Sequence, residues 1–177
     1  YNHNPLTHGM FLFNTLSSFF WLFTDNNYIL RLPFAIFGFL LIFIPLLLRK
    51  ELGFIPCYIF SIFLTISPSI AYFSRFARND IFMAFFLLIF IISIIKYVKS
   101  SQNVWIYISV ASLSIGYTIK ESMYINVLGL LVFLLFYSFN DIKNVILGKI
   151  SLDKITNETK IFIIIFTLSL PLSAPLV

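Results

Sequence analysis

The feature that most constrains this chain is a series of apolar runs with charged residues only at their ends. Three of these runs contain no charged residue: about 32–48, 54–72 and 81–95. A fourth apolar region, 104–139, is interrupted only by Lys120 and Glu121. As one helix it would be roughly 54 Å long at about 1.5 Å per residue, far beyond a hydrocarbon core of about 30 Å. We therefore expect two membrane spans that meet at the charged pair.

The composition supports an integral membrane protein. Of the 177 residues, 60% are hydrophobic and only 11% are charged, whereas a soluble domain carries about a quarter charged residues. The predicted fold is all-α, a polytopic transmembrane bundle of about six spans preceded by an interfacial helix. The net charge of +5 does not indicate nucleic acid, because the basic residues lie singly or in pairs at the ends of apolar runs. Membrane lipids are the expected partner.

The whole chain, 1–177, is predicted to belong to one transmembrane domain that continues beyond both ends, so we treat it as an internal fragment of a longer protein. Its expected parts are an outer-loop or interfacial segment at 1–28, five spans within 29–139, a cytoplasmic loop at 140–160 and the start of a sixth span at 161–177. Pro33 is expected in the first turn of the first span.

Alternating spans divide the charges between two sides. One side receives Arg49, Lys50, Lys96, Lys99, Lys143, Lys149, Lys154 and Lys160. The opposite side receives Arg31, Arg75, Arg78 and Lys120. The positive-inside rule places the richer side in the cytoplasm. This predicts a multi-pass protein of the plasma membrane whose loops at 73–80 and 120–121 are extracytoplasmic.

The loop at 73–80 is the first candidate site. Arg75 and Arg78 are three residues apart and would share a face in a helical turn, and arginine suits bidentate contact with phosphate oxygens. Asp80 could orient an arginine or accept hydrogen bonds from sugar hydroxyls. The alternative is that both arginines lie at lipid headgroups and that Asp80 caps the next helix.

Lys120 and Glu121 form the second candidate site, because ionisable residues between two spans are costly and are often functional. The alternative is an ordinary interfacial turn. His8 is weak support for a base or metal ligand, and an interfacial histidine is the alternative. The sequence contains no Gly-rich phosphate loop, nucleophile elbow or Cys/His metal cluster. We expect no cofactor from it, and it carries no signal about a divalent metal.

The order of several motifs resembles the GT-C membrane glycosyltransferases of the protein-mannosyltransferase-like group, and most closely the flippase-activity-associated family of archaea and bacteria. The motifs are Asn4-Pro5, His8-Gly9, Arg31-Leu32-Pro33, Arg49-Lys50-Glu51-Leu52-Gly53, Ser67-Pro68, Ser74-Arg75-Phe76-Ala77-Arg78-Asn79-Asp80 and Lys120-Glu121. The Ser74–Asp80 string is the most specific of them. The opening segment departs from the pattern, because Asp-Pro and His-Gly-Pro would be expected where Asn4-Pro5 and His8-Gly9-Met10 stand.

The resemblance implies an enzyme that takes a sugar from a polyprenyl-phosphate carrier on the extracytoplasmic side and transfers it to a glycan, lipid or protein. Its catalytic base, a carboxylate, would lie upstream of Tyr1, so no catalytic residue is assigned within the chain. Phosphate contacts would fall to Arg75, Arg78 and Lys120, while Asp80 and Glu121 would orient them or contact the sugar.

Two other functions are consistent with the sequence. A non-catalytic flippase or transport component would use the same cations to guide a lipid phosphate, but it would need polar residues inside the spans. Few are present, mainly Ser61, Thr65, Ser93 and Ser112. A structural membrane subunit is the third possibility, and in it charge substitutions in the outer loops would have little effect.

Overall fold

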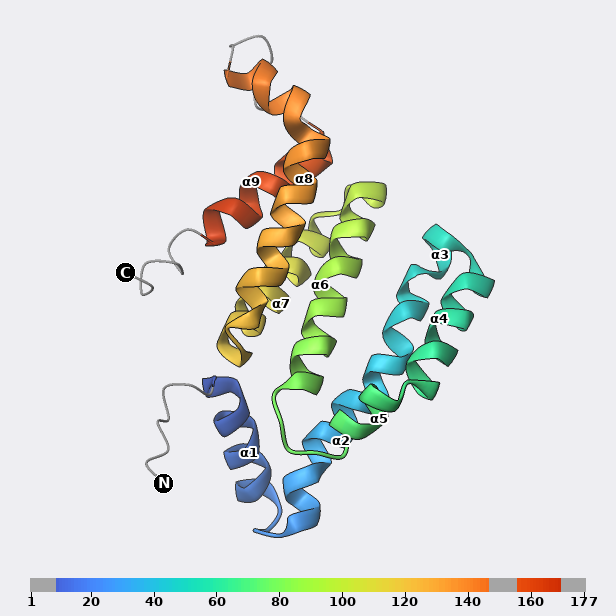
Figure 1. Cartoon of the computed structure of the whole chain (residues 1–177), viewed down its shortest axis with the longest axis vertical. Helices are drawn as coiled ribbons and strands as arrows, with labels where there is room; N and C mark the ends of the chain where they lie inside the picture. Colours follow the sequence, from blue (N-terminus) through green and yellow to red (C-terminus); the bar gives the residue numbers. More distant parts are fainter. Residues whose placement is uncertain (1–8, 147–155, 170–177) are drawn as a thin grey trace.

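The computed structural model describes residues 9–146 and 156–169, and the described part of the chain is entirely helical in its regular structure (Figure 1). This confirms the all-α prediction. The helices are α1 (Met10–Leu22), α2 (Asn27–Phe43), α3 (Arg49–Leu52), α4 (Phe54–Ile66), α5 (Pro68–Phe73), α6 (Asp80–Ser100), α7 (Asn103–Ile119), α8 (Ser122–Ile146) and α9 (Asn157–Ser169). A 3₁₀ segment, Ile44–Leu48, joins α2 to α3.

Three described helical stretches are long and apolar enough to cross a membrane: Asn27–Leu52, Asp80–Ser100 and Ser122–Phe139. The helices α1, α4 and α7 are apolar but shorter. The expected span at 54–72 is divided in two, because α4 ends at Ile66 and α5 begins at Pro68. A proline disfavours helical geometry in the residue before it, and Ser67 has a ψ of 117°.

The start of α2 also differs from the expectation. The helix begins at Asn27, because the side chain of Asn26 accepts a hydrogen bond from the Tyr28 amide at 3.4 Å and so acts as an N-cap. Pro33 consequently lies inside α2, and not in its first turn. Its side chain is buried, and it has no N–H to donate to the preceding turn.

Two later helices extend beyond the predicted boundaries. The helix α6 continues past residue 95 to Ser100 and ends where Ser101 adopts a left-handed conformation with φ of 55°. The helix α8 continues to Ile146 and so occupies the first part of the expected loop at 140–160. In both cases the helix carries its lysines in its last turns, where cations interact favourably with the helix dipole.

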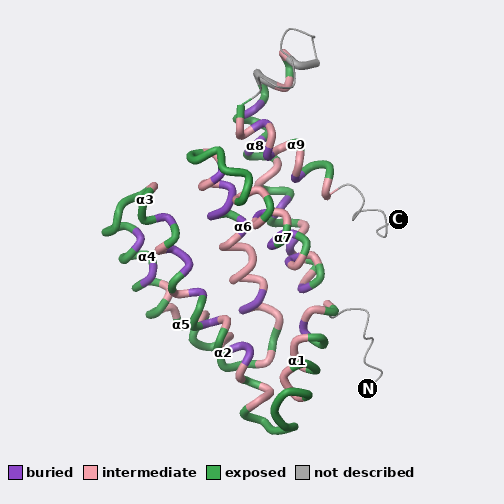
Figure 2. The backbone as a smooth tube through the Cα atoms, turned by 180° about the vertical axis from the view of Figure 1, so that it is seen from behind, coloured by how far each residue is buried: buried purple, intermediate pink, exposed green. Residues whose placement is uncertain are grey.

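The helix α6 is the centre of the molecule (Figures 1 and 2). Its residues Phe82 and Ile92 belong to a hydrophobic cluster shared with α1, α2 and α4. Its residues Phe90 and Ile94 belong to a second cluster shared with α7, α8 and α9. Because α6 joins both clusters, its two ends provide fixed positions for the charged residues that lie there.

A group of phenylalanines fixes the first turns of α6. The ring of Phe82 lies 4.8 Å from that of Phe34 and 4.8 Å from that of Phe37, both on α2, and 5.4 Å from that of Phe11 on α1. Tilted and edge-to-face pairs of this kind contribute about 0.5–1.5 kcal/mol each beyond area burial. Both Phe34 and Phe82 are fully buried. This packing holds the start of α6, and with it Asp80, against α1 and α2.

Candidate functional site

Asp80 joins two of the predicted site residues. It is the first residue of α6, while Lys120 follows the last residue of α7, and these antiparallel helices bring the two residues to the same end of the molecule. Lys120 Nζ donates a hydrogen bond to Asp80 Oδ1 at 2.6 Å. Arg78 Nε lies 3.4 Å from Asp80 Oδ2. Each carboxylate oxygen therefore faces one cation, and we call Arg78, Asp80 and Lys120 the Asp80 cluster.

The members of the Asp80 cluster differ in exposure. The side chain of Asp80 is 22% exposed, whereas those of Lys120 and Arg78 are 42% and 56% exposed. An ammonium has three N–H donors and a guanidinium has five, so one contact with Asp80 leaves most of the donors of both cations unused. The cluster can therefore accept a further anion without releasing Asp80.

Arg75 lies at a neighbouring cavity of about 360 Å³. The described residues that line it are Arg31, Ala71, Tyr72, Arg75 and Phe76. The rings of Tyr72 and Phe76 are stacked, with centroids 5.6 Å apart and an interplanar angle of 13°. Arg75 forms no ion pair with a described carboxylate. The cavity thus combines two exposed guanidinium groups with an aromatic wall.

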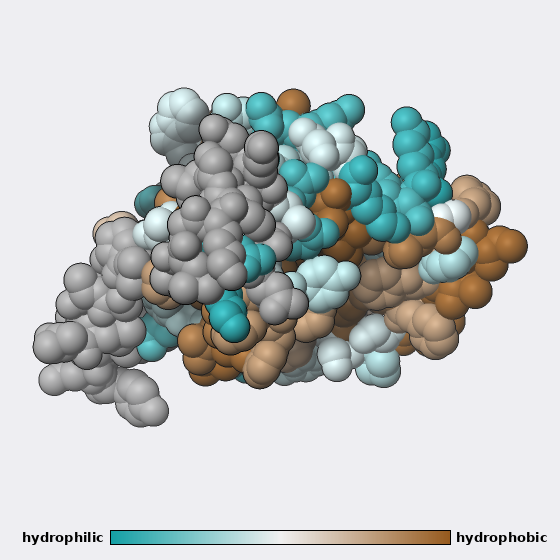
Figure 3. All heavy atoms as spheres, turned by 90° about the horizontal axis from the view of Figure 1, so that it is seen from above, coloured by the Kyte–Doolittle hydropathy of each residue, from teal (hydrophilic) through white to brown (hydrophobic). Residues whose placement is uncertain are grey.

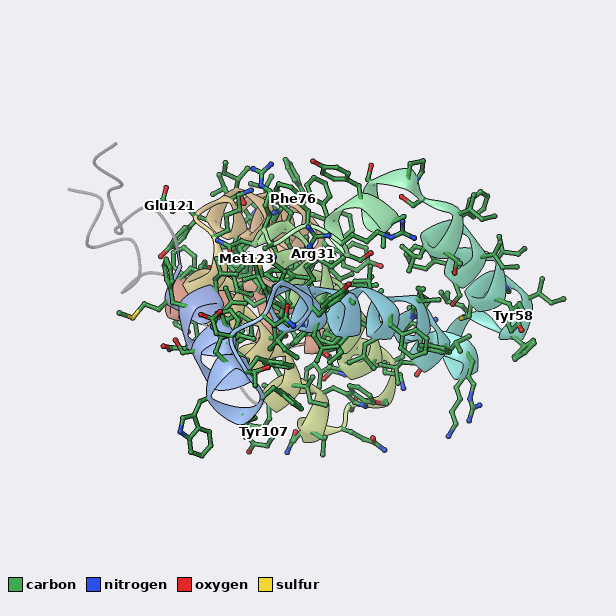
Figure 4. All side chains as sticks on the ribbon, turned by 90° about the horizontal axis from the view of Figure 1, so that it is seen from below. Arg31, Tyr58, Phe76, Tyr107, Glu121 and Met123 are labelled. Atoms are coloured by element: carbon green, nitrogen blue, oxygen red, sulfur yellow. The ribbon has the colours of Figure 1, made fainter. Side chains whose placement is uncertain are left out.

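Arg31 is a site residue that sequence reasoning did not single out. Figure 4 shows Arg31 lying close to Phe76 at the end of the molecule seen from below. The signal that could have found it was its place among the four cations assigned to the same side of the membrane. That grouping already put Arg31 at the same interface as Arg75.

The expectation that Arg75 and Arg78 share a helical face is wrong. The helix α5 ends at Phe73 and α6 begins only at Asp80, so both arginines lie in the irregular connection between them. Arg75 lines the cavity beside α2 and α5, whereas Arg78 faces Asp80. The two arginines thus hold two adjacent positions and do not form one pair.

The remaining predicted residues are not joined to these groups. Glu121 is exposed, forms no ion pair with a described residue, and lies at the edge of the molecule in Figure 4. His8 lies outside the described residues. Gly9, which follows it, packs directly against the backbone carbonyls of Thr118 and Ile119 at the end of α7, leaving no room for a side chain at this position.

The other end of α6 carries a second charged group, which we call the Glu51 cluster. Lys96 Nζ lies 3.6 Å from Glu51 Oε1 and 4.2 Å from the centre of the Trp105 ring. The side chains of Glu51 and Lys96 are each only 12% exposed. Figure 3 looks onto this end and shows hydrophilic residues in the upper and central part of the view and hydrophobic residues in its lower and right-hand parts. The prediction placed Lys96 on the same side as Arg49 and Lys50, and the contact of Lys96 with the next residue, Glu51, puts them at one end of the molecule. The membrane side of each end stays a prediction.

Within the part of the chain that the structure describes, no three His, Cys, Asp or Glu side chains gather in a way that could hold a metal ion.

Asp80 lies in the first turn of α6, where a carboxylate is favoured by the helix dipole. The capping alternative is not borne out, because the N-cap of α6 is Asn79, without a side-chain cap hydrogen bond, and both carboxylate oxygens of Asp80 face cations.

The sequence profile of the dolichyl-phosphate-mannose-protein mannosyltransferase family matches residues 7–152. The matched range contains every described residue of the Asp80 cluster and of the Arg31–Arg75 cavity. No curated protein and no solved structure matches the chain. The narrower resemblance to the flippase-activity-associated family stays a prediction.

Proposed function

Since the chain belongs to the dolichyl-phosphate-mannose-protein mannosyltransferase family, we propose that it forms part of the membrane core of a glycosyltransferase that takes a sugar from a polyprenyl-phosphate donor on the extracytoplasmic side. The observation that carries this proposal is an excess of cations at one end of the bundle. Arg31, Arg75, Arg78 and Lys120 lie there, and Asp80 is the one described carboxylate in an ion pair with them.

The chemistry of the donor explains why cations are needed. When the acceptor oxygen attacks the anomeric carbon of the sugar, the bond from that carbon to the phosphate oxygen breaks, and the electron pair stays on the phosphate. The lipid phosphate thereby gains negative charge. Preorganised cations that meet this charge stabilise the transition state more than the ground state. We assign this role to Arg75, Arg78 and Lys120, with Arg31 as a fourth cation.

Asp80 is a positioning residue in this proposal. By holding Lys120 at 2.6 Å and Arg78 at 3.4 Å, it keeps two cations close together that would otherwise repel each other. A preorganised pair needs less rearrangement when the phosphate binds. Glu121, at the edge of the site, is proposed to contact the sugar or the acceptor. The same role is proposed for His8, which lies outside the described residues. The general base, a carboxylate that deprotonates the acceptor hydroxyl, is not assigned to a residue of this chain.

Hydroxyl groups inside the helices argue against the transport alternative. The Thr65 hydroxyl donates to the Ser61 carbonyl and the Ser112 hydroxyl to the Ile108 carbonyl, both at 2.8 Å. These two hydroxyls are satisfied by their own helices, whereas the buried hydroxyls of Ser61 and Ser93 have no hydrogen-bond partner among the described residues. Four isolated hydroxyls are few for a chain of this length. They do not supply a polar path along which a phosphate could cross the bilayer, so enzyme activity is the first function to test.

The test uses the full-length protein in liposomes with polyprenyl-phosphate-mannose and a serine- and threonine-containing peptide. Mass spectrometry of the peptide measures mannosyl transfer. We expect the wild type to transfer mannose and Arg75→Ala to lower kcat/KM about 100-fold, the loss typical of one missing charge-stabilising donor. The matched control is Lys50→Ala, which removes an exposed cation at the opposite end of the bundle.

Two results would overturn the proposal. The first is wild-type protein that transfers no sugar to peptide, glycan or lipid acceptors while it moves a lipid-linked sugar across the liposome membrane. The second is Arg75→Ala protein with the same activity as Lys50→Ala protein. That result would favour the alternative in which Arg75 contacts lipid headgroups as a membrane anchor.

A further inference from the structure

We propose that the groove between α6 and α8 is a binding site for a zwitterionic aminophospholipid of the phosphatidylethanolamine class. The groove has a volume of about 420 Å³, which is within the range of about 300–1,000 Å³ found for small-molecule sites. It lies toward the end of α6 that carries the Glu51 cluster. It is therefore separate from the Asp80 cluster, and its test does not depend on the proposed sugar transfer.

The walls of the groove are apolar and open. Ile91 and Ile95 contribute to it from α6, and Phe133 and Tyr137 from α8. The side chains of Phe133 and Tyr137 are 63% and 72% exposed. In a chain that crosses a membrane, such a surface faces hydrocarbon, and a groove in it accommodates an acyl chain more closely than a flat helix face does.

The length of the groove places it in one leaflet. From Ile91 to Lys99, α6 rises by about 12 Å at roughly 1.5 Å per residue. Half of the hydrocarbon core is about 15 Å thick. A lipid whose chain lies along this stretch therefore has its headgroup at Lys99, at the membrane surface where α6 ends.

Two opposite charges at this mouth indicate the headgroup. Lys99 is in the last turn of α6 and Glu158 in the first turn of α9, and both line the groove. They form no ion pair with each other. Lys99 Nζ donates to the Glu51 backbone carbonyl at 3.2 Å. The Glu158 carboxylate has no hydrogen bond or ion pair with a described residue.

A zwitterionic aminophospholipid complements this arrangement. Its phosphate matches the Lys99 ammonium, and its own primary ammonium can donate hydrogen bonds to the Glu158 carboxylate. An anionic lipid without an amine would gain the first contact but would meet repulsion from Glu158. A choline headgroup carries a positive charge but no N–H donor. The pair of charges therefore favours the aminophospholipid over both.

Native mass spectrometry of the full-length protein tests the site. The protein is released from nanodiscs that contain equimolar phosphatidylethanolamine, phosphatidylglycerol and phosphatidylcholine with distinguishable chain masses. We expect retained phosphatidylethanolamine to exceed each of the others by roughly five-fold, the factor expected for a partly exposed ion pair. Glu158→Gln should abolish the preference over phosphatidylcholine, and Lys99→Ala should lower retention of all three lipids.

Two control variants accompany the test. Lys50→Ala removes a cation near the same end that does not line the groove and should leave selectivity unchanged. Ile91→Trp fills the groove and should remove the retained lipid.

The proposal is overturned by equal retention of the three lipids, by a preference for phosphatidylglycerol, or by a Glu158→Gln variant that changes thermal stability but not selectivity. In that last case Glu158 only stabilises the first turn of α9 and does not bind lipid. Lack of any retained lipid in the wild type, as when another segment of the full chain fills the groove, would also overturn it.

Discussion

The two ends of α6 both carry a carboxylate beside basic residues, but the two clusters differ in exposure and in balance. In the Glu51 cluster one carboxylate meets one ammonium, each only 12% exposed, and the face of Trp105 covers the same ammonium. In the Asp80 cluster one carboxylate meets two cations that are about half exposed. In the first arrangement the two charges are paired with each other through Glu51 Oε1, while Glu51 Oε2 is buried without a hydrogen-bond partner among the described residues. The second leaves positive charge available for a ligand.

We interpret this difference as a separation between charges that support the fold and charges that we propose bind a ligand. A buried charge is costly to leave unpaired, so the Glu51 cluster fixes α3 against the end of α6. Exposed ion pairs contribute only about 0–1 kcal/mol to stability. The ion pairs of the Asp80 cluster therefore contribute little to the stability of the bundle. We interpret the position of its cations as that of a ligand-binding group.

The largest predicted effect is on the Glu51 cluster. Glu51→Gln should lower the free energy of unfolding by about 3 kcal/mol, because Lys96 then remains charged and nearly buried without a counter-charge. Steric trapping in bicelles measures this free energy. The double variant with Lys96→Met should recover most of the loss, and sugar transfer per folded molecule should stay within about two-fold of wild type, well inside one tenfold step of 1.36 kcal/mol.

The comparison fails if Glu51→Gln leaves stability unchanged but lowers sugar transfer. The Glu51 cluster would then have the role that we assign to the Asp80 cluster.

The second effect concerns Asp80. Asp80→Asn should lower kcat/KM about ten-fold, or 1.36 kcal/mol of transition-state stabilisation, because Lys120 and Arg78 lose the carboxylate that holds them together. Stability should change by less than about 1 kcal/mol, since both cations are substantially exposed. Transfer assays and unfolding measurements on the same preparation separate the two readouts. A loss of stability larger than that of Glu51→Gln would contradict the distinction between the clusters.

The sequence predicts at which end of the bundle each charged residue lies, but not which residues pair there. The apolar runs and their flanking charges assigned Arg75, Arg78, Asp80 and Lys120 to one end and Lys96 to the other. The lengths of the apolar runs and the alternation of spans suffice for that assignment, because both are read from local composition.

The pairing within each end could not be predicted, because it depends on tertiary packing. Nothing in the string Ser74–Asp80 indicates that Arg75 turns toward Arg31 on α2 while Arg78 turns toward Asp80. The break at Ser67 and Pro68 and the irregular connection after α5 decide this. For the same reason the position of Lys96 between Glu51 and Trp105 has no signature in its immediate sequence.

A smaller effect is predicted for the aromatic part of the Glu51 cluster. Trp105→Phe should lower the free energy of unfolding by about 0.5–1 kcal/mol, because phenylalanine has a weaker cation-binding face than tryptophan. A double-mutant cycle with Lys96→Met isolates this interaction from the packing of the ring. A coupling energy near zero would show that Trp105 only covers Lys96 and does not bind it.

The smallest effect is predicted for Glu121, which tests where the Asp80 cluster ends. Glu121 follows Lys120 directly, yet it is exposed and forms no ion pair with a described residue. We propose that Glu121 contacts sugar hydroxyls at the edge of the site, and glutamine can still make hydrogen bonds there. Glu121→Gln should therefore raise KM by less than about five-fold and leave kcat unchanged. This corresponds to a loss of binding free energy below about 1 kcal/mol. Steady-state kinetics with varied donor measure this. A ten-fold fall in kcat would mean that Glu121 acts with Asp80 on the cations, and the boundary of the cluster would then have to include both carboxylates.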